Sequence, residues 1–152
     1  PAIFQAVKAY CPQKKNLGTA ILLDVSGILR HKTPGAPDLT STTRSNAMDT
    51  PSTHVLISFI LNKGTADDAM AAARKAGASG GTILNAQGTG KEDDVKFFGI
   101  SLVPEKEMLI TIVPQDKASG VIEAVKSVPS LAEPGAGIAF TMDILDFAPL
   151  GK

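Results

Sequence analysis

Two glycine-containing stretches are the parts of this sequence best suited to ligand chemistry. The first is Gly88-Thr89-Gly90-Lys91, which a run of charged residues follows, and the second is Pro134-Gly135-Ala136-Gly137. Because glycine lacks a Cβ atom, its backbone can approach a ligand closely and direct N–H groups at an anion. The first stretch is therefore a candidate phosphate-binding turn, a partner-binding loop or only a tight bend.

The first stretch does not match the P-loop pattern. That pattern needs glycine at position 85 and serine or threonine at position 92, where this chain has Asn85 and Glu92. Glu92, Asp93 and Asp94 carry the oxygen ligands that divalent cations prefer, but we interpret them as the solvated charges of a loop. Lys91 is the one cation for which we consider a functional role, and the alternative is that its charge serves only solubility.

Residues for catalysis or for a metal centre are sparse. His31 and His54 have no second histidine or cysteine close to them, so no zinc site or catalytic dyad is expected. Cys11 is interpreted as a packed small residue. Since no nucleophile, base and orienting group come together in the sequence, we predict no catalytic residues, no metal site and no enzyme activity.

Composition narrows the choice of partners. Lys and Arg number 15, equal to Asp and Glu, and 5% of the residues are aromatic, with no Trp. Nucleic acid binding is therefore not expected, because both a positive field and stacking platforms are lacking. No apolar run reaches the length of a membrane span, and a single cysteine fits a reducing compartment, so a soluble, cytoplasmic protein is expected.

Hydrophobic periodicity predicts a βαββαβ order from residue 54 onward. Helix 65–76 is expected to begin at Thr65 as N-cap, with Asp68 three positions on, and to stop at Gly77. Residues Pro104-Glu105-Lys106 are interpreted as a turn. The expected strands are residues 55–61, the stretch 80–91, 108–113 and 138–145, and the second helix ends before Pro129.

This order predicts an α+β, ferredoxin-like fold, with a four-stranded antiparallel sheet and two helices on one face. Several strands are apolar on both faces, although the helices cover only one. The other face must be buried by something, and further copies of the chain are the simplest candidate.

The first part of the chain carries a partial repeat. Residues 3–8 have helical spacing and match residues 121–126, while 18–25 resemble a strand and match 137–144 with one residue of slippage. Residues 1–31 therefore look like the second helix and last strand of a similar domain. Residues 32–53 have the composition of a linker, in which 45–48 (Ser-Asn-Ala-Met) resemble a cloning scar, and 54–150 form the main domain.

The order and spacing of four segments resemble the P-II signal-transduction proteins, in particular their divergent members. The segments are residues 80–83, 88–91, 110–114 and 135–140. The resemblance covers residues 54 to 147 and implies a regulatory homotrimer with ligand clefts between subunits. It also implies that adenine nucleotide lies in the cleft and that the loop after the second strand grips a protein target, such as a transporter or an enzyme.

Carried over to this sequence, the resemblance assigns two sets of residues. Thr82 would lie near the adenine, and the two glycine turns would lie near the phosphates. The implied ligand residues are Thr82, Gly88, Thr89, Gly90, Lys91, Gly135, Ala136 and Gly137. The implied partner loop is Glu92, Asp93, Asp94, Val95, Lys96, Phe97 and Phe98.

Several positions depart from the typical members of that family. Ile138 replaces the phosphate-binding lysine of the second turn, residues 146–150 lack the expected arginines, and Glu92 replaces a glutamine that helps to hold magnesium and 2-oxoglutarate. Tyr10 lies outside the loop, so uridylylation of a loop tyrosine is excluded. Because each lost charge-assisted bond is worth roughly 1.5–3 kcal/mol, a smaller ligand, a monophosphate nucleotide or no ligand at all stays open.

Two alternatives complete the set of hypotheses. One is a trimer of the divalent-cation-tolerance type, which shares this architecture, and which the scarcity of His and Cys argues against. The other is a purely structural trimerisation module.

Overall fold

The computed structural model describes residues 2–10, 17–23, 53–88, 96–97, 100–101 and 104–150. These residues belong to two compact units, one comprising Thr53–Met142 and the other Pro1–Ser52 together with Asp143–Lys152. No helix in the described part of the chain is long and apolar enough to cross a membrane.

The larger unit contains the predicted four-stranded sheet. Its strands are β2 (His54–Asn62), β3 (Gly81–Gln87), β6 (Glu105–Pro114) and the first part of β7 (Gly137–Leu150), in the order β7-β2-β6-β3. β6 is antiparallel to both neighbours, pairing His54↔Pro114 through Asn62↔Lys106 with β2 and Gly81↔Thr111 through Gln87↔Glu105 with β3. The ferredoxin-like βαββαβ order predicted from the sequence is therefore confirmed.

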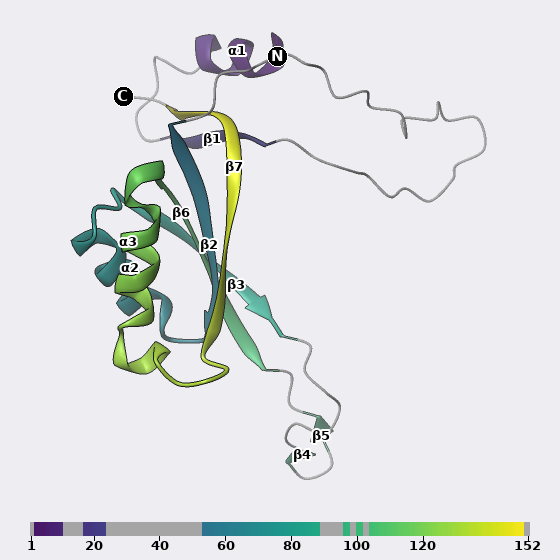
Figure 1. Ribbon diagram of the computed structural model, residues 1–152. Coiled ribbons are helices and arrows are strands. Elements are labelled where there is room, and N and C mark those ends of the chain that lie inside the picture. The colour runs from purple at the N-terminus through teal and green to yellow at the C-terminus, as the bar shows by residue number, and fades with distance from the viewer. Residues whose placement is uncertain are drawn as a thin grey trace, which may run out of the picture. The chain divides into compact units, whose positions relative to one another are not determined.

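Two helices cover one face of this sheet, as Figure 1 shows. They are α2 (Ala66–Lys75) and α3 (Ala118–Lys126), and they pack against each other. Between helices and sheet lies an aliphatic core in which Ile57, Leu109 and Val121 are fully buried. Each such side chain contributes about 1.5–3 kcal/mol through burial. β2 is apolar on both faces, and the residues that it contributes to this core are Val55, Ile57, Phe59 and Leu61.

The start of α2 corrects one sequence prediction. Thr65 does precede the helix, but its side chain makes no capping bond and its hydroxyl donates to the carbonyl of Asn62 at 2.7 Å. Instead, Glu107 on β6 accepts the backbone N–H of Ala66 through Oε2 at 3.1 Å. A carboxylate at this position satisfies one free N–H and interacts favourably with the helix dipole, so a residue distant in sequence replaces the local cap.

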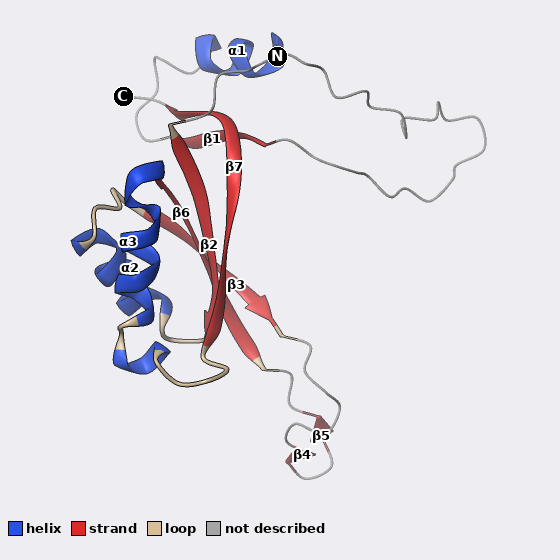
Figure 2. Ribbon diagram, viewed as in Figure 1, coloured by secondary structure: helices blue, strands red, loops and turns tan. Residues whose placement is uncertain are grey.

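Other predicted boundaries are confirmed or extended. Gly77 ends α2 with a positive φ of 106°, and α3 ends before Pro129, which begins a short 3₁₀ turn. The turn predicted at residues 104–106 is wrong for Glu105 and Lys106, because both belong to β6 and pair with β3. In Figure 2 the helices of this unit lie on one side and the strands on the other.

A short antiparallel pair lies between β3 and β6 in the sequence. It consists of β4 (Lys96–Phe97) and β5 (Ile100–Ser101).

The smaller unit contains the helix and strand predicted near the start of the sequence. α1 (Ala2–Tyr10) precedes β1 (Gly18–Leu23), which pairs antiparallel with the second part of β7. Lys8 forms an ion pair with Asp146 at 2.6 Å, and its ammonium lies 4.7 Å from the centroid of the Phe4 ring. The predicted continuation of the strand to residue 25, the linker up to residue 52 and the tetrapeptide 45–48 lie outside the described residues.

Candidate functional site

Gly88, the first residue of the first glycine turn, lies where β3 and β6 separate. The backbone N–H of Gly88 donates to the carbonyl of Pro104 at 2.8 Å, immediately beyond the last strand pair, Gln87↔Glu105. A Cβ atom added to Gly88 would lie 3.3 Å from side-chain carbons of Lys106 and Pro104. Glycine here therefore lets the Lys106 stem lie against the backbone at the base of the loop.

The structure describes only part of the predicted loop. Thr82 lies on β3 with its side chain exposed, and Lys96 and Phe97 form β4. Thr89, Gly90, Lys91, residues 92–95 and Phe98 lie outside the described residues.

The second glycine turn is hydrogen-bonded to the end of β2. Gly135 has a φ of 83°, the left-handed region that favours glycine. Ala136 is buried; its N–H donates to the carbonyl of Glu133 at 3.1 Å, and its own carbonyl accepts the N–H of Asn62 at 3.2 Å. At Gly137 a Cβ atom would lie 2.7 Å from the carbonyl oxygen of Ile60. The packing against β2 thus requires glycine at 137 independently of any ligand.

The two turns lie on opposite edges of the four-stranded sheet. Gly88 follows β3, Gly137 begins β7, and the order β7-β2-β6-β3 places two strands between them. Neighbouring strands are roughly 4.8 Å apart, so three steps amount to about 14 Å. Within one copy of the chain, Gly88 and the second glycine turn therefore lie apart.

A lysine that sequence reasoning missed lies between the turns. Lys106 pairs with Asn62 of β2 and with Ala86 of β3, and its Nζ donates to Oδ1 of Asn62 at 2.5 Å. Nearby, Lys63 forms an exposed ion pair with Glu105 at 2.8 Å. Sequence reasoning missed Lys106 because Pro104 indicates a turn there. Residues 105–107 are all charged, so no apolar alternation extends the strand signal to Lys106.

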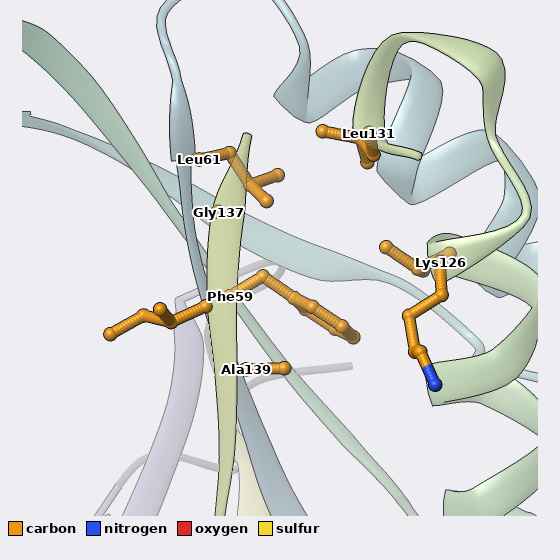
Figure 3. A pocket seen from close by; sticks show the side chains of 8 residues that line it. Phe59, Leu61, Lys126, Leu131, Gly137 and Ala139 are labelled. Atoms are coloured by element: carbon orange, nitrogen blue, oxygen red, sulfur yellow. The ribbon is translucent and has the colours of Figure 1, made fainter. Parts of the chain in front are cut away.

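The sheet face opposite the helices exposes large apolar side chains. The Ala139 side chain points into the cavity under α3, which Ile138 also borders (Figure 3). By strand alternation the side chains of Ile138, Phe140 and Met142 lie on the opposite face of β7. Their exposed fractions are 62%, 39% and 37%, and Leu84 on the other edge is 46% exposed. The register Leu84↔Met108 places Leu84 on this same face. We refer to these residues as the open sheet face.

A small apolar cavity lies on the helix side of the sheet (Figure 3). Its volume is about 60 Å³, and Phe59 and Ala139 point into it toward α3 and Leu131. Binding pockets for small molecules usually measure about 300–1,000 Å³, so this cavity is too small for a nucleotide.

The described residues contain no group of three or more His, Cys, Asp or Glu side chains that could hold a metal ion.

Comparison with known proteins gives a family for the chain. The model of the family "Nitrogen regulatory protein P-II" matches residues 54–149. Among solved structures, the chain is similar to the crystal structure of Arabidopsis thaliana PII bound to citrate, with 18% identity, a TM-score of 0.47, and coverage of 60% of this chain and 75% of that one. A likeness at this level carries no argument, and no curated protein matches.

The family match spans well over half of the chain and includes both glycine turns. It agrees with the strand order and with the resemblance found in the sequence. This protein therefore belongs to the nitrogen regulatory protein P-II family, whose members are signalling regulators and not enzymes.

Proposed function

We propose that this chain is a homotrimeric regulator in which a small anionic ligand, bound between subunits, controls a protein-binding loop. The loop comprises residues 91–98 and its target is a transporter or an enzyme in the cytoplasm. The observation that carries the proposal is the position of the two glycine turns on opposite edges of one sheet. A site that uses both turns needs two copies of the chain, with β3 of one facing β7 of another.

The open sheet face supports the trimer. Exposed apolar side chains on β3 and β7, together with half-buried Met108, Ile110 and Ile112 on β6, make this face largely apolar. A patch of this kind on a single chain favours association, because burying it removes apolar area from water.

The ligand we expect is an adenine nucleotide with few phosphates. Lys106 supplies one cation at the base of the loop, and Lys63 a second that is already paired with Glu105. The Ala136 N–H is engaged by Glu133, so this part of the second turn offers fewer free donors than the sequence implied. A triphosphate needs several cations, whereas a monophosphate needs about one or two such contacts.

The loop responds to the ligand through its base. Gly88 and Pro104 close the loop with a 2.8 Å hydrogen bond, and the Lys106 side chain lies against that closure. A ligand that draws the Lys106 ammonium away from Asn62 would change the packing at the closure and shift the population of loop conformations.

A thermal-shift screen with sedimentation tests the proposal. We expect a trimer, and a saturable rise in melting temperature with at least one of AMP, ADP, ATP and cAMP. A trimer that responds to none of the four would reject the ligand and leave a structural module, whereas a monomer at micromolar concentration would reject the inter-subunit site itself.

A further inference from the structure

The helix–strand pair α1–β1 repeats the pair α3–β7 in sequence, and both copies have the same secondary structure. Residues 3–8 match 121–126, and a strand beginning with glycine follows each helix. In both copies apolar residues recur at the spacing i, i+4, i+7, which on a helix is one face. The matched stripes are Ile3, Val7 and Tyr10 on α1, and Val121 and Val125 on α3 with Val128 just beyond its end.

The two stripes differ sharply in burial. Val121 and Val125 are 0% and 2% exposed, because α3 packs against α2 and the core of the sheet. On α1, Ile3 is 81% and Tyr10 is 89% exposed. Val7, the counterpart of Val125, is half-buried, so the face that the fold covers on α3 is uncovered at the two ends of α1.

Other side chains of α1, Phe4 and Lys8, make the packing and ion-pair contacts of this helix. Phe4 is buried at 7% exposure, and Lys8 lies over its ring while binding Asp146 at 2.6 Å. The open stripe therefore belongs to a helix that is already anchored, with the two ends of its apolar side left free.

β1 pairs antiparallel with the second part of β7, from Gly18↔Leu150 to Leu23↔Ile144. Its other edge is unpaired among the described residues, so a further strand could be added there.

We propose that α1–β1 is the second half of another P-II-like unit, and that its stripe binds the first half of such a unit. The occupant is a strand–helix–strand segment like β2–α2–β3: its small-residue helix would cover Ile3 and Tyr10, as α2 covers the stripe of α3. Its first strand would take the edge of β1 away from β7, which is unpaired among the described residues. A second copy of this chain is a poor occupant, since its own α2 already covers α3.

Binding of a first-half probe to the 152-residue chain tests this proposal. The probe is residues 53–117 of this sequence fused to a soluble carrier, with the carrier alone as blank. We expect saturable binding of one probe per chain by titration calorimetry. Ile3→Lys should weaken binding about tenfold or more, because it places a charge in the apolar contact. Gln5→Lys, an exposed polar neighbour on α1, is the matched control and should leave the affinity unchanged.

Three results would overturn the proposal. The first is no saturable binding to the unaltered chain. The second is equal binding to the Ile3→Lys chain, which would mean that the probe exchanges into residues 53–142. The third is a smaller oligomer for Ile3→Lys than for the unaltered chain in sedimentation without probe, which would identify a second copy as the cover of the stripe. Since Ile3 is exposed, its variant retains the fold.

Discussion

Nζ of Lys106 donates a hydrogen bond to Oδ1 of Asn62, whose backbone N–H in turn donates to the carbonyl of Ala136 at 3.2 Å. These two contacts connect the base of the loop after β3 with the second glycine turn, across β6 and β2. Lys106 is therefore linked through Asn62 to the second glycine turn, although Gly88 and Gly137 are about 14 Å apart across the sheet.

Removing the Lys106 charge should weaken anion binding. Lys106→Gln keeps a side chain that can bond to Asn62 but loses a charge-assisted contact, so we expect about tenfold weaker binding of whichever nucleotide raises the melting temperature. Calorimetric titration measures the affinity. Lys75→Gln, an exposed lysine in the last turn of α2, is the control. Equal affinities for both variants would exclude Lys106 from the site.

A charge on the open sheet face should dissociate the oligomer. Phe140→Lys places an ammonium on the exposed apolar face of β7, and we expect association weaker by about tenfold or more in analytical ultracentrifugation. The adjacent Thr141→Lys makes the same change on the other face of the strand and should remain a trimer. If Thr141→Lys dissociated the oligomer and Phe140→Lys did not, the interface would lie on the helix side of the sheet and not on the open sheet face.

A methyl group at Gly137 should destabilise the fold whether or not a ligand is bound. The added Cβ would lie 2.7 Å from the Ile60 carbonyl and 2.8 Å from a Leu61 methyl carbon. We expect Gly137→Ala to lower the free energy of unfolding by about 1–3 kcal/mol in urea denaturation.

Gly120 provides the opposite case for comparison. It lies in α3 with no atom within 4 Å of an added Cβ. Gly120→Ala should raise stability by up to about 1 kcal/mol, because alanine is the better helix former. If the two glycine variants had equal stability, the close approach at Gly137 would be contradicted.

Glu107 should stabilise the N-terminus of α2, because Thr65 makes no side-chain capping bond there. Glu107→Ala removes the acceptor for the Ala66 N–H and a favourable charge at the helix N-terminus, so we expect a loss of about 1 kcal/mol in the free energy of unfolding. Glu123→Ala, which breaks only the exposed pair with Lys126, should cost less than about 0.5 kcal/mol. A smaller loss for Glu107→Ala than for Glu123→Ala would exclude the capping role.

The sequence by itself determined the order of elements in the larger unit. The unbroken apolar run from Val55 and the stripe that includes Val121 predicted a doubly buried strand and a helix, because periodicity depends only on local geometry. Gly77 likewise ended its helix, since a positive φ is a local requirement. The family resemblance rested on the spacing of such segments.

Only the tertiary structure decided how distant positions meet. Glu107 caps a helix 41 residues earlier, and Lys106 reaches Asn62 from a neighbouring strand. The exposure of Ile3 beside the burial of its counterpart Val121 is likewise a matter of packing. Such relations depend on strand order and register. Hydrophobic patterns restrict the order and the register but do not specify them, because a strand with a given pattern can pair with several neighbours until the whole sheet is assembled.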